Sequence, residues 1–176
     1  MPTLHSQSAD TLLLTVDFDN NDHARDFLAL LDHYAHDPMG GGDGLSLYAK
    51  AHLVERLRTR TDFVGILAYR HGCAVGLINL IEGFSTFAAR PLLNVHDVVV
   101  HESCRGQGIA QQLLEAAEQV AQTRGCCKLT LEVLEGNHGA RLLYQRAGFE
   151  PYGLDPAMGQ ALFFEKKLNS EAPQAG

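Results

Sequence analysis

Long apolar runs are absent from this chain. No stretch approaches the roughly 20 consecutive apolar residues that a helix needs to span a bilayer. The first ten residues, MPTLHSQSAD, also lack the basic flank and apolar centre of a secretory signal peptide. Both absences argue against a membrane partner and against export, so we expect a cytoplasmic protein.

Basic residues are in the minority. The chain has 14 Lys and Arg residues against 21 Asp and Glu residues, which gives a formal net charge of −7. A nucleic-acid partner requires a basic surface that neutralises phosphates. The charge balance therefore argues against nucleic acid and fits a small cationic substrate better.

Cysteines are few and show no metal-binding spacing. The chain has four, with no C-x-x-C pair among them, so no metal site is predicted. The adjacent Cys126 and Cys127 are expected to pack as small hydrophobes. Cys104, beside Arg105, is either a reactive thiol or an incidental loop residue. The histidines other than His96 are expected at the surface without metal-ligand spacing, among them His33, His36, His71, His101 and His138.

Apolar periodicity predicts one mixed α/β domain over residues 1–176, with flexible tails at 1–9 and 170–176. A length of 176 residues with 45% hydrophobic content is enough for one core. The pattern predicts helices at about 20–36, 46–58, 109–124 and 139–148, and strands at 10–17, 62–69, 73–81, 92–100, 128–134, 149–152 and 161–168. Residues 82–91 are expected to be a connection, with Phe84 and Phe87 either in the core or beside a substrate.

A Val-rich strand, a glycine-bearing turn and a helix follow one another at 92–124. The first turn of a helix has unpaired N–H groups and the positive end of the helix dipole, so it can hold an anion. Glycine lets the backbone approach a phosphate closely. Position 111 is Gln, so the third glycine of a dinucleotide-binding turn is missing, and no Gly-Lys-Ser/Thr follows. The turn consists of Arg105, Gly106, Gln107, Gly108, Ile109 and Ala110.

Two motifs carry a family resemblance. Arg-x-x-Gly-x-Ala at 105–110 resembles the pyrophosphate loop of the GCN5-related N-acetyltransferase (GNAT) superfamily, and NHGARLLYQRAGF at 137–149 resembles its second signature. The resemblance implies the acyl-CoA N-acyltransferase fold, a mostly antiparallel sheet flanked by helices. Its central parallel strands, here 92–100 and 128–134, splay apart. It also implies acetyl-coenzyme A as co-substrate, and a homodimer is a further expectation because similar proteins are often dimers.

The resemblance assigns a role to each motif. Backbone amides among Val98, Val99 and Val100 would bind the pantetheine and polarise the thioester, and residues 105–110 would hold the pyrophosphate. Asn137 would bind the cofactor, cap its helix, or do both. Tyr144 matches the family's acid for the leaving thiolate, the alternative being plain core packing.

The general base is left open by the sequence. The stretch LLNVHDVVV most resembles the diamine (spermidine/spermine) acetyltransferase branch, which has Glu-Asp where this chain has His96 and Asp97. Histidine is suited to proton transfer at neutral pH. Adjacent strand residues face opposite sides, so only one of the two is expected in the cleft, and a bulge would change which one. Glu82 and a water chain are the remaining alternatives.

These features predict an N-acetyltransferase that moves the acetyl group to a primary amine of a small molecule by direct attack in a ternary complex. A coenzyme A-binding sensor without catalysis is the alternative favoured by the missing strand glutamate. A protein or peptide N-acetyltransferase is the third. The acceptor is not specified, because residues 37–46 and 82–92 match no motif.

Overall fold

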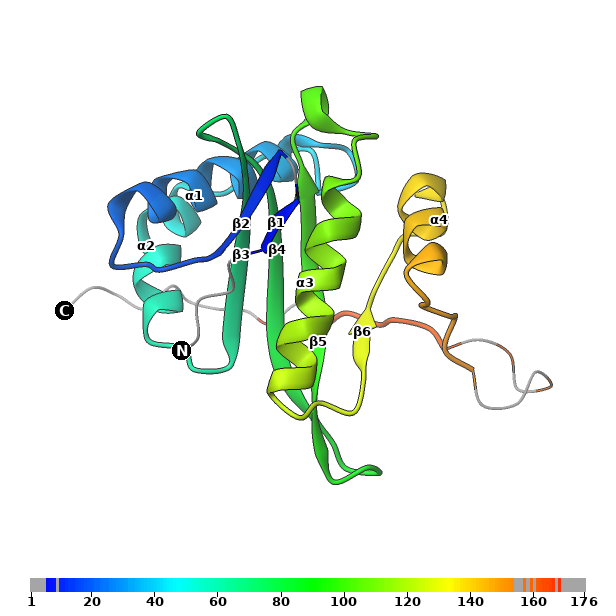
Figure 1. The fold of residues 1–176 in the computed structure, drawn as a ribbon. Coiled ribbons are helices and arrows are strands. Elements are labelled where there is room, and N and C mark those ends of the chain that lie inside the picture. The colour runs from blue at the N-terminus through cyan, green and yellow to red at the C-terminus, as the bar shows by residue number, and fades with distance from the viewer. Residues whose placement is uncertain are drawn as a thin grey trace.

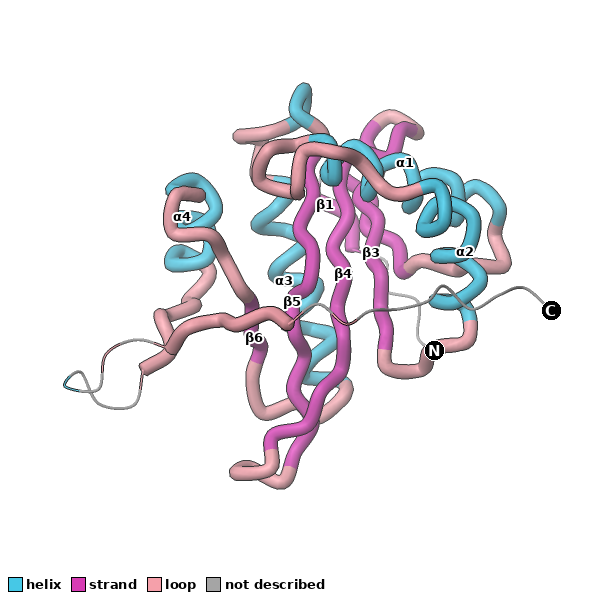
Figure 2. Tube along the Cα trace, turned by 180° about the vertical axis from the view of Figure 1, so that it is seen from behind, coloured by secondary structure: helices cyan, strands magenta, loops and turns pink. Residues whose placement is uncertain are grey.

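A six-stranded sheet forms the centre of the protein, and helices cover both of its faces (Figures 1 and 2). A computed structural model describes residues 6–8, 10–153, 157, 159, 161–166 and 168. Strand order follows chain order: β1 (Ser6–Ser8), β2 (Thr11–Thr15), β3 (Phe63–Arg70), β4 (Cys73–Ser85), β5 (Arg90–Val100) and β6 (Leu129–Leu131). The helices are α1 (Asn21–His36), α2 (Leu47–Arg58), α3 (Ile109–Thr123) and α4 (His138–Arg146), with a 3-10 turn, η1, at Glu102–Cys104.

The fold class is the predicted one. All strand pairs are antiparallel except β5 and β6, which are parallel. The parallel pair lies at one side of the described sheet, whereas the sequence placed it at the centre. The strands expected at 149–152 and 161–168 would have lain beyond it, and no described residue of either range is in a strand.

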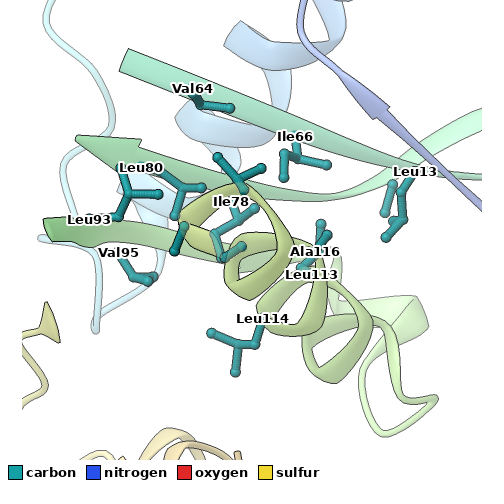
Figure 3. Close-up of a cluster of buried hydrophobic side chains, with 14 of the residues drawn as sticks. Leu13, Val64, Ile66, Ile78, Leu80, Leu93, Val95, Leu113, Leu114 and Ala116 are labelled. Atoms are coloured by element: carbon teal, nitrogen blue, oxygen red, sulfur yellow. The ribbon is translucent and has the colours of Figure 1, made fainter. Parts of the chain in front are cut away.

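Two apolar clusters hold the helices on the sheet. Helix α3 packs on one face through Ile109, Leu113 and Ala117, and Figure 3 shows this cluster between α3 and the strands. Helix α1 packs on the other face through Phe27 and Leu30, against Leu77 and other residues of the strands. Most apolar side chains in the middle of β4 enter one cluster or the other, which is why this part of its sequence is apolar almost without interruption.

Side-chain caps begin both N-terminal helices where the sequence predicted them. The Asn20 side chain accepts a hydrogen bond from the Asp22 N–H (2.9 Å) at the start of α1. Ser46 accepts from the Ala49 N–H (3.1 Å) at the start of α2. These bonds satisfy donors that a helix leaves unpaired.

Two predicted segments ahead of the C-terminal part differ from the structure. Residues 82–91 are not a free connection, because β4 and β5 stay paired out to Ser85 and Arg90. Phe84 and Phe87 are exposed on this hairpin, so neither packs in the core. At the N-terminus, residues 6–8 form β1 within the expected tail.

The C-terminal part also departs from expectation. The Phe149 N–H donates to the Tyr144 carbonyl (2.9 Å) and its ring packs on Tyr144, so it ends α4 instead of starting a strand. Leu162, Phe163 and Phe164, in the strand predicted at 161–168, are exposed. The tail expected at 170–176 lies outside the described residues. Within the described residues, the helices are too short or too polar to cross a membrane.

Candidate active site at the splayed strands

Strands β5 and β6 separate partway along β5. They pair only at Leu93–Leu129, Asn94–Thr130 and Val95–Leu131. Beyond Val95, β5 continues to Val100 without β6 beside it. Figure 1 shows the chain after β6 turning away from β5 toward α4. The predicted splay is therefore present.

A β-bulge lies where the two strands part. On β4, Leu80 is paired with Val95 and the preceding Asn79 is paired with Asp97, which leaves His96 as the extra residue of β5. Val95 and Val98 both pack against the α3 cluster, although a regular strand would turn them to opposite faces. The alternation that predicted opposite faces for His96 and Asp97 therefore does not hold here.

The free edge of β5 presents backbone N–H groups to the gap. The His101 N–H donates to the Val75 carbonyl of β4 (2.9 Å). Because alternate residues of an antiparallel strand face the partner, Val99 also points its N–H toward β4. Val98 and Val100 then point theirs into the gap. Of the three predicted valines, these two have amides available for a ligand.

The glycine turn leaves open space above the start of α3. Gly106 and Gly108 have φ angles of +74° and +80°, which favour glycine. A Cβ built on either residue would meet no atom within 4 Å. The buried side chain of Ile109 anchors the helix on the sheet, so its first N–H groups are held toward that space. This surface fits a diphosphate.

The polar side chains of the turn are already engaged. Arg105 contacts the Asp37 carboxylate (2.9 Å) and donates through Nε to the Val100 carbonyl (3.2 Å). Gln107 accepts a hydrogen bond from Arg70 and donates to the Ser103 carbonyl. A bond from the Met39 N–H, followed by the Arg105 guanidinium, lowers the pKa of Asp37. Backbone groups are thus the main free donors of the turn.

Asp97 lies on the sheet face that α1 covers. Its Oδ2 accepts a hydrogen bond from Nδ2 of the buried Asn79 (2.8 Å). The charge of Asp97 also helps to raise the pKa of Tyr34 on α1, after the larger effect of burial. His96 is exposed beside it. The carboxylate of Asp97 is therefore held in place, and the imidazole of His96 is open to solvent.

Tyr144 is half-buried on α4, across the gap. Burial raises the pKa of its phenol to about 12, with a smaller Coulombic contribution from Tyr34. Its ring packs against Phe149 with centroids 5.9 Å apart. Asn137 caps the same helix by accepting from the Ala140 N–H (3.1 Å). Both expected uses of Tyr144, packing and proton donation, are compatible with this placement.

Other residues considered from the sequence lie elsewhere. Glu82 forms an ion pair with Arg124 at the end of α3 (2.7 Å), on the α3 face of the sheet and away from Asp97. Cys104 packs at the edge of the α3 cluster. His33 and His101, expected at the surface, are half-buried and stacked on each other with centroids 4.7 Å apart.

Asn79 and Tyr34 were not singled out by the sequence. Tyr34 follows the helical spacing of its neighbours and looks like core. Asn79 had a usable signal, because it is a single amide within the apolar run CAVGLINLI of β4. A lone polar residue inside a buried strand requires a partner.

Comparison with known proteins identifies the family. The profile of the acetyltransferase (GNAT) family matches residues 27–149, which is more than half of the chain. The chain belongs to the GNAT acetyltransferase family. Its motifs at 105–110 and 137–149 lie within the matched range, and GNAT enzymes are acetyl-coenzyme A-dependent N-acetyltransferases.

Individual GNAT relatives are similar over parts of the chain. The uncharacterized N-acetyltransferase YycN of Bacillus subtilis is 41% identical over 56 residues, which are 32% of this chain and 36% of YycN. The thialysine N-epsilon-acetyltransferase of Bos taurus is 34% identical over 76 residues, which are 43% of this chain and 44% of that enzyme. The matched region thus spans less than half the length of these two relatives.

Solved structures share the fold. An aminoglycoside acetyltransferase from an uncultured soil metagenomic sample, in complex with trehalose, superimposes with a TM-score of 0.73 at 16% identity. The match covers 90% of this chain and 97% of that one. At this identity the likeness concerns the GNAT fold and leaves the substrate open.

Proposed function

We propose that this protein transfers the acetyl group of acetyl-coenzyme A to the primary amine of a small cationic molecule, by direct attack in a ternary complex. One observation carries the proposal. The parallel strands β5 and β6 part along β5, and the glycine turn that follows β5 is open, since a Cβ at Gly106 or Gly108 would meet no atom within 4 Å. Family membership supplies the chemistry.

The residues that would hold the co-substrate follow from this geometry. The N–H groups of Val98 and Val100 would bind the pantetheine arm in the gap. Residues 106–110 would hold the diphosphate through backbone donors, with Arg105 adding charge, and Asn137 would add a polar contact at the start of α4. Bound acetyl-coenzyme A would supply the thioester carbonyl that the amine attacks.

The chain's own residues would handle the protons. We assign the base to Asp97, which would take a proton from the ammonium directly or through water, with His96 as the alternative. Asp97 is preferred because its carboxylate is fixed, whereas His96 is exposed. Tyr144 would donate its phenol proton to the leaving thiolate. With a pKa of about 12, this phenol remains protonated at neutral pH.

A small cationic amine is the acceptor that the observations favour. The net charge is −7, and Asp97 lies on the face opposite α3. The bovine relative is named for acetylating thialysine at an ε-nitrogen, and the stretch LLNVHDVVV resembles the diamine branch. A homodimer stays a prediction.

An amine panel tests the proposal. Purified protein, acetyl-coenzyme A and a set of diamines, amino acids, aminoglycosides and peptides are assayed by release of free thiol. Turnover confined to small cationic amines is expected. Tight coenzyme A binding without transfer to any amine would favour the sensor, and turnover on peptides alone would favour the protein acetyltransferase.

Replacing the assigned acid gives the first specific prediction. Tyr144→Phe should lower kcat by about 100-fold or more, the usual effect of losing a general acid, while the Kd of coenzyme A changes little. Tyr48→Phe, an exposed tyrosine on α2, is the matched control and should retain full kcat. Unchanged turnover in Tyr144→Phe would remove Tyr144 from this role.

A further inference from the structure

Asn79 is an amide buried at the middle of an apolar strand. It is 3% exposed, and its neighbours Ile78 and Leu80 are fully buried. Its Nδ2 donates to Oδ2 of Asp97 (2.8 Å). Its Oδ1 is buried and finds no hydrogen-bond donor among the described residues. A buried carbonyl without a partner destabilises a fold, so an apolar residue would suit this position better.

The orientation of the amide follows from its partner. If the amide were reversed, Oδ1 would lie against the Asp97 carboxylate, and two acceptors would face each other. The observed orientation satisfies the charged carboxylate and leaves the neutral carbonyl unsatisfied. The Asn79 amide therefore fixes the position of the Asp97 carboxylate.

The surroundings of Asp97 offer few other fixed polar groups. Asn79 is its hydrogen-bond partner on β4. Tyr34, on the covering helix α1, is the titratable group whose pKa the charge of Asp97 helps to raise. Tyr34 in turn contributes to the raised pKa of Tyr144 on α4. On β5 its chain neighbour is the exposed His96. Tyr34 directs its own hydroxyl to the Met39 carbonyl (3.3 Å), which leaves Asn79 as the donor that fixes the carboxylate.

We infer that Asn79 is a positioning residue for the transfer reaction. Its amide holds the Asp97 carboxylate in one orientation on the acceptor face, and the unpaired Oδ1 is the cost of placing that donor inside the sheet. The inference rests on the proposed function, in which Asp97 receives the proton of the acceptor ammonium.

Asn79→Leu tests the inference, because it removes the amide while keeping a side chain of similar size. The melting temperature should change little, since removal of the unpaired buried carbonyl offsets the loss of the hydrogen bond to Asp97. The kcat should fall roughly 10- to 100-fold, the range expected for losing one hydrogen bond to a charged group, with the Kd of coenzyme A unchanged. The KM of the acceptor amine should change much less than kcat, because the variant keeps the Asp97 carboxylate in the site but no longer fixes its orientation.

Controls separate positioning from packing. Thr11→Val removes another buried polar group, on β2, whose hydroxyl accepts from Arg70, and its kcat should match that of the wild type. Asn79→Ser, which is smaller and too short to reach Asp97, should lower kcat as Asn79→Leu does, and it serves if the leucine variant does not fold. In an Asp97→Asn background, Asn79→Leu should cause no further loss of kcat, since its effect passes through Asp97.

The outcomes distinguish the two claims. A wild type that acetylates an amine, combined with an Asn79→Leu variant of unchanged kcat, overturns the inference alone. Equal losses from Asn79→Leu in the wild-type and Asp97→Asn backgrounds also overturn it. A wild type that binds coenzyme A but acetylates no amine overturns the proposed function, and the inference with it.

Discussion

Tyr144 is held where its phenol is neutral over the whole physiological range. Burial against the α3 cluster raises its pKa to about 12. A phenol in the unfolded chain titrates near pH 10. Between these values the unfolded state ionises and the folded state does not, so this residue lowers stability as the pH rises from about 10 to 12. Below pH 10 the proton remains available for a leaving thiolate.

A spectroscopic titration tests this environment. The phenolate absorbance that disappears in Tyr144→Phe relative to wild type should develop near pH 12 in the folded protein, because burial disfavours the phenolate. The same difference measured in denaturant should develop near pH 10, which provides the control. A difference that develops near pH 10 in both states would show that Tyr144 is solvated.

At this scale the sequence predicted the residues that belong to motifs and missed those defined by contact. Tyr144 and the glycine turn were predicted because each belongs to a short sequence motif. Asn79 acts through a partner on β5, and Tyr34 acts through residues on β5 and α4. Strand register decides which of these residues meet. The bulge at His96 is a further example, because only the pairing of β4 with β5 shows which residue is extra.

The element that the site depends on is the start of α3. Gly106 and Gly108 both adopt positive φ, and Gly108 is the N-cap residue, with no side chain to satisfy the first N–H groups. An ordinary helix would use Ser, Thr, Asp or Asn there. A glycine cap leaves those donors free for an external anion and lets it approach the backbone.

Gly108→Ala should weaken coenzyme A binding. A Cβ at φ +80° costs about 1–2 kcal/mol of strain, and it projects into the open space where the diphosphate is proposed to bind. Calorimetry should show at least a tenfold rise in Kd. Gly125→Ala, at φ +68° and likewise unobstructed just past the other end of α3, is the matched control. It should lower the melting temperature comparably and leave the Kd alone, and an equal rise in Kd there would refute the assignment.

Elements were predictable where one face of them is buried. Helices α1 to α4 and strands β2 to β5 appear close to their predicted bounds, because apolar period and capping residues agree. The hairpin end at 82–91 was missed because both of its faces meet solvent, so burial imposes no pattern on it. The segment 161–168 shows the opposite error, a predicted strand whose apolar side chains Leu162, Phe163 and Phe164 are exposed.

Across the whole molecule, the layered arrangement separates two tasks. The α3 face and the β5–β6 gap offer backbone donors suited to an anionic co-substrate. The α1 face carries Asp97 and suits a cation. In the proposed function, this separation would let a protein with a net charge of −7 hold a phosphate-bearing ligand through local dipoles while its overall field attracts a cationic acceptor.

Ionic strength should therefore affect acceptors differently. Surface charges act over about 30 Å at 0.01 M salt and about 8 Å at 0.15 M. The kcat/KM for a diamine with two positive charges should fall several-fold over this range, because screening removes its attraction to an acidic protein. The kcat/KM for a zwitterionic amino acid, which carries no net charge, should change little. The measurement is initial rates at saturating acetyl-coenzyme A with each acceptor varied at both salt concentrations. Equal salt dependence for the two acceptors would mean that the net charge of the protein has no part in choosing its substrate.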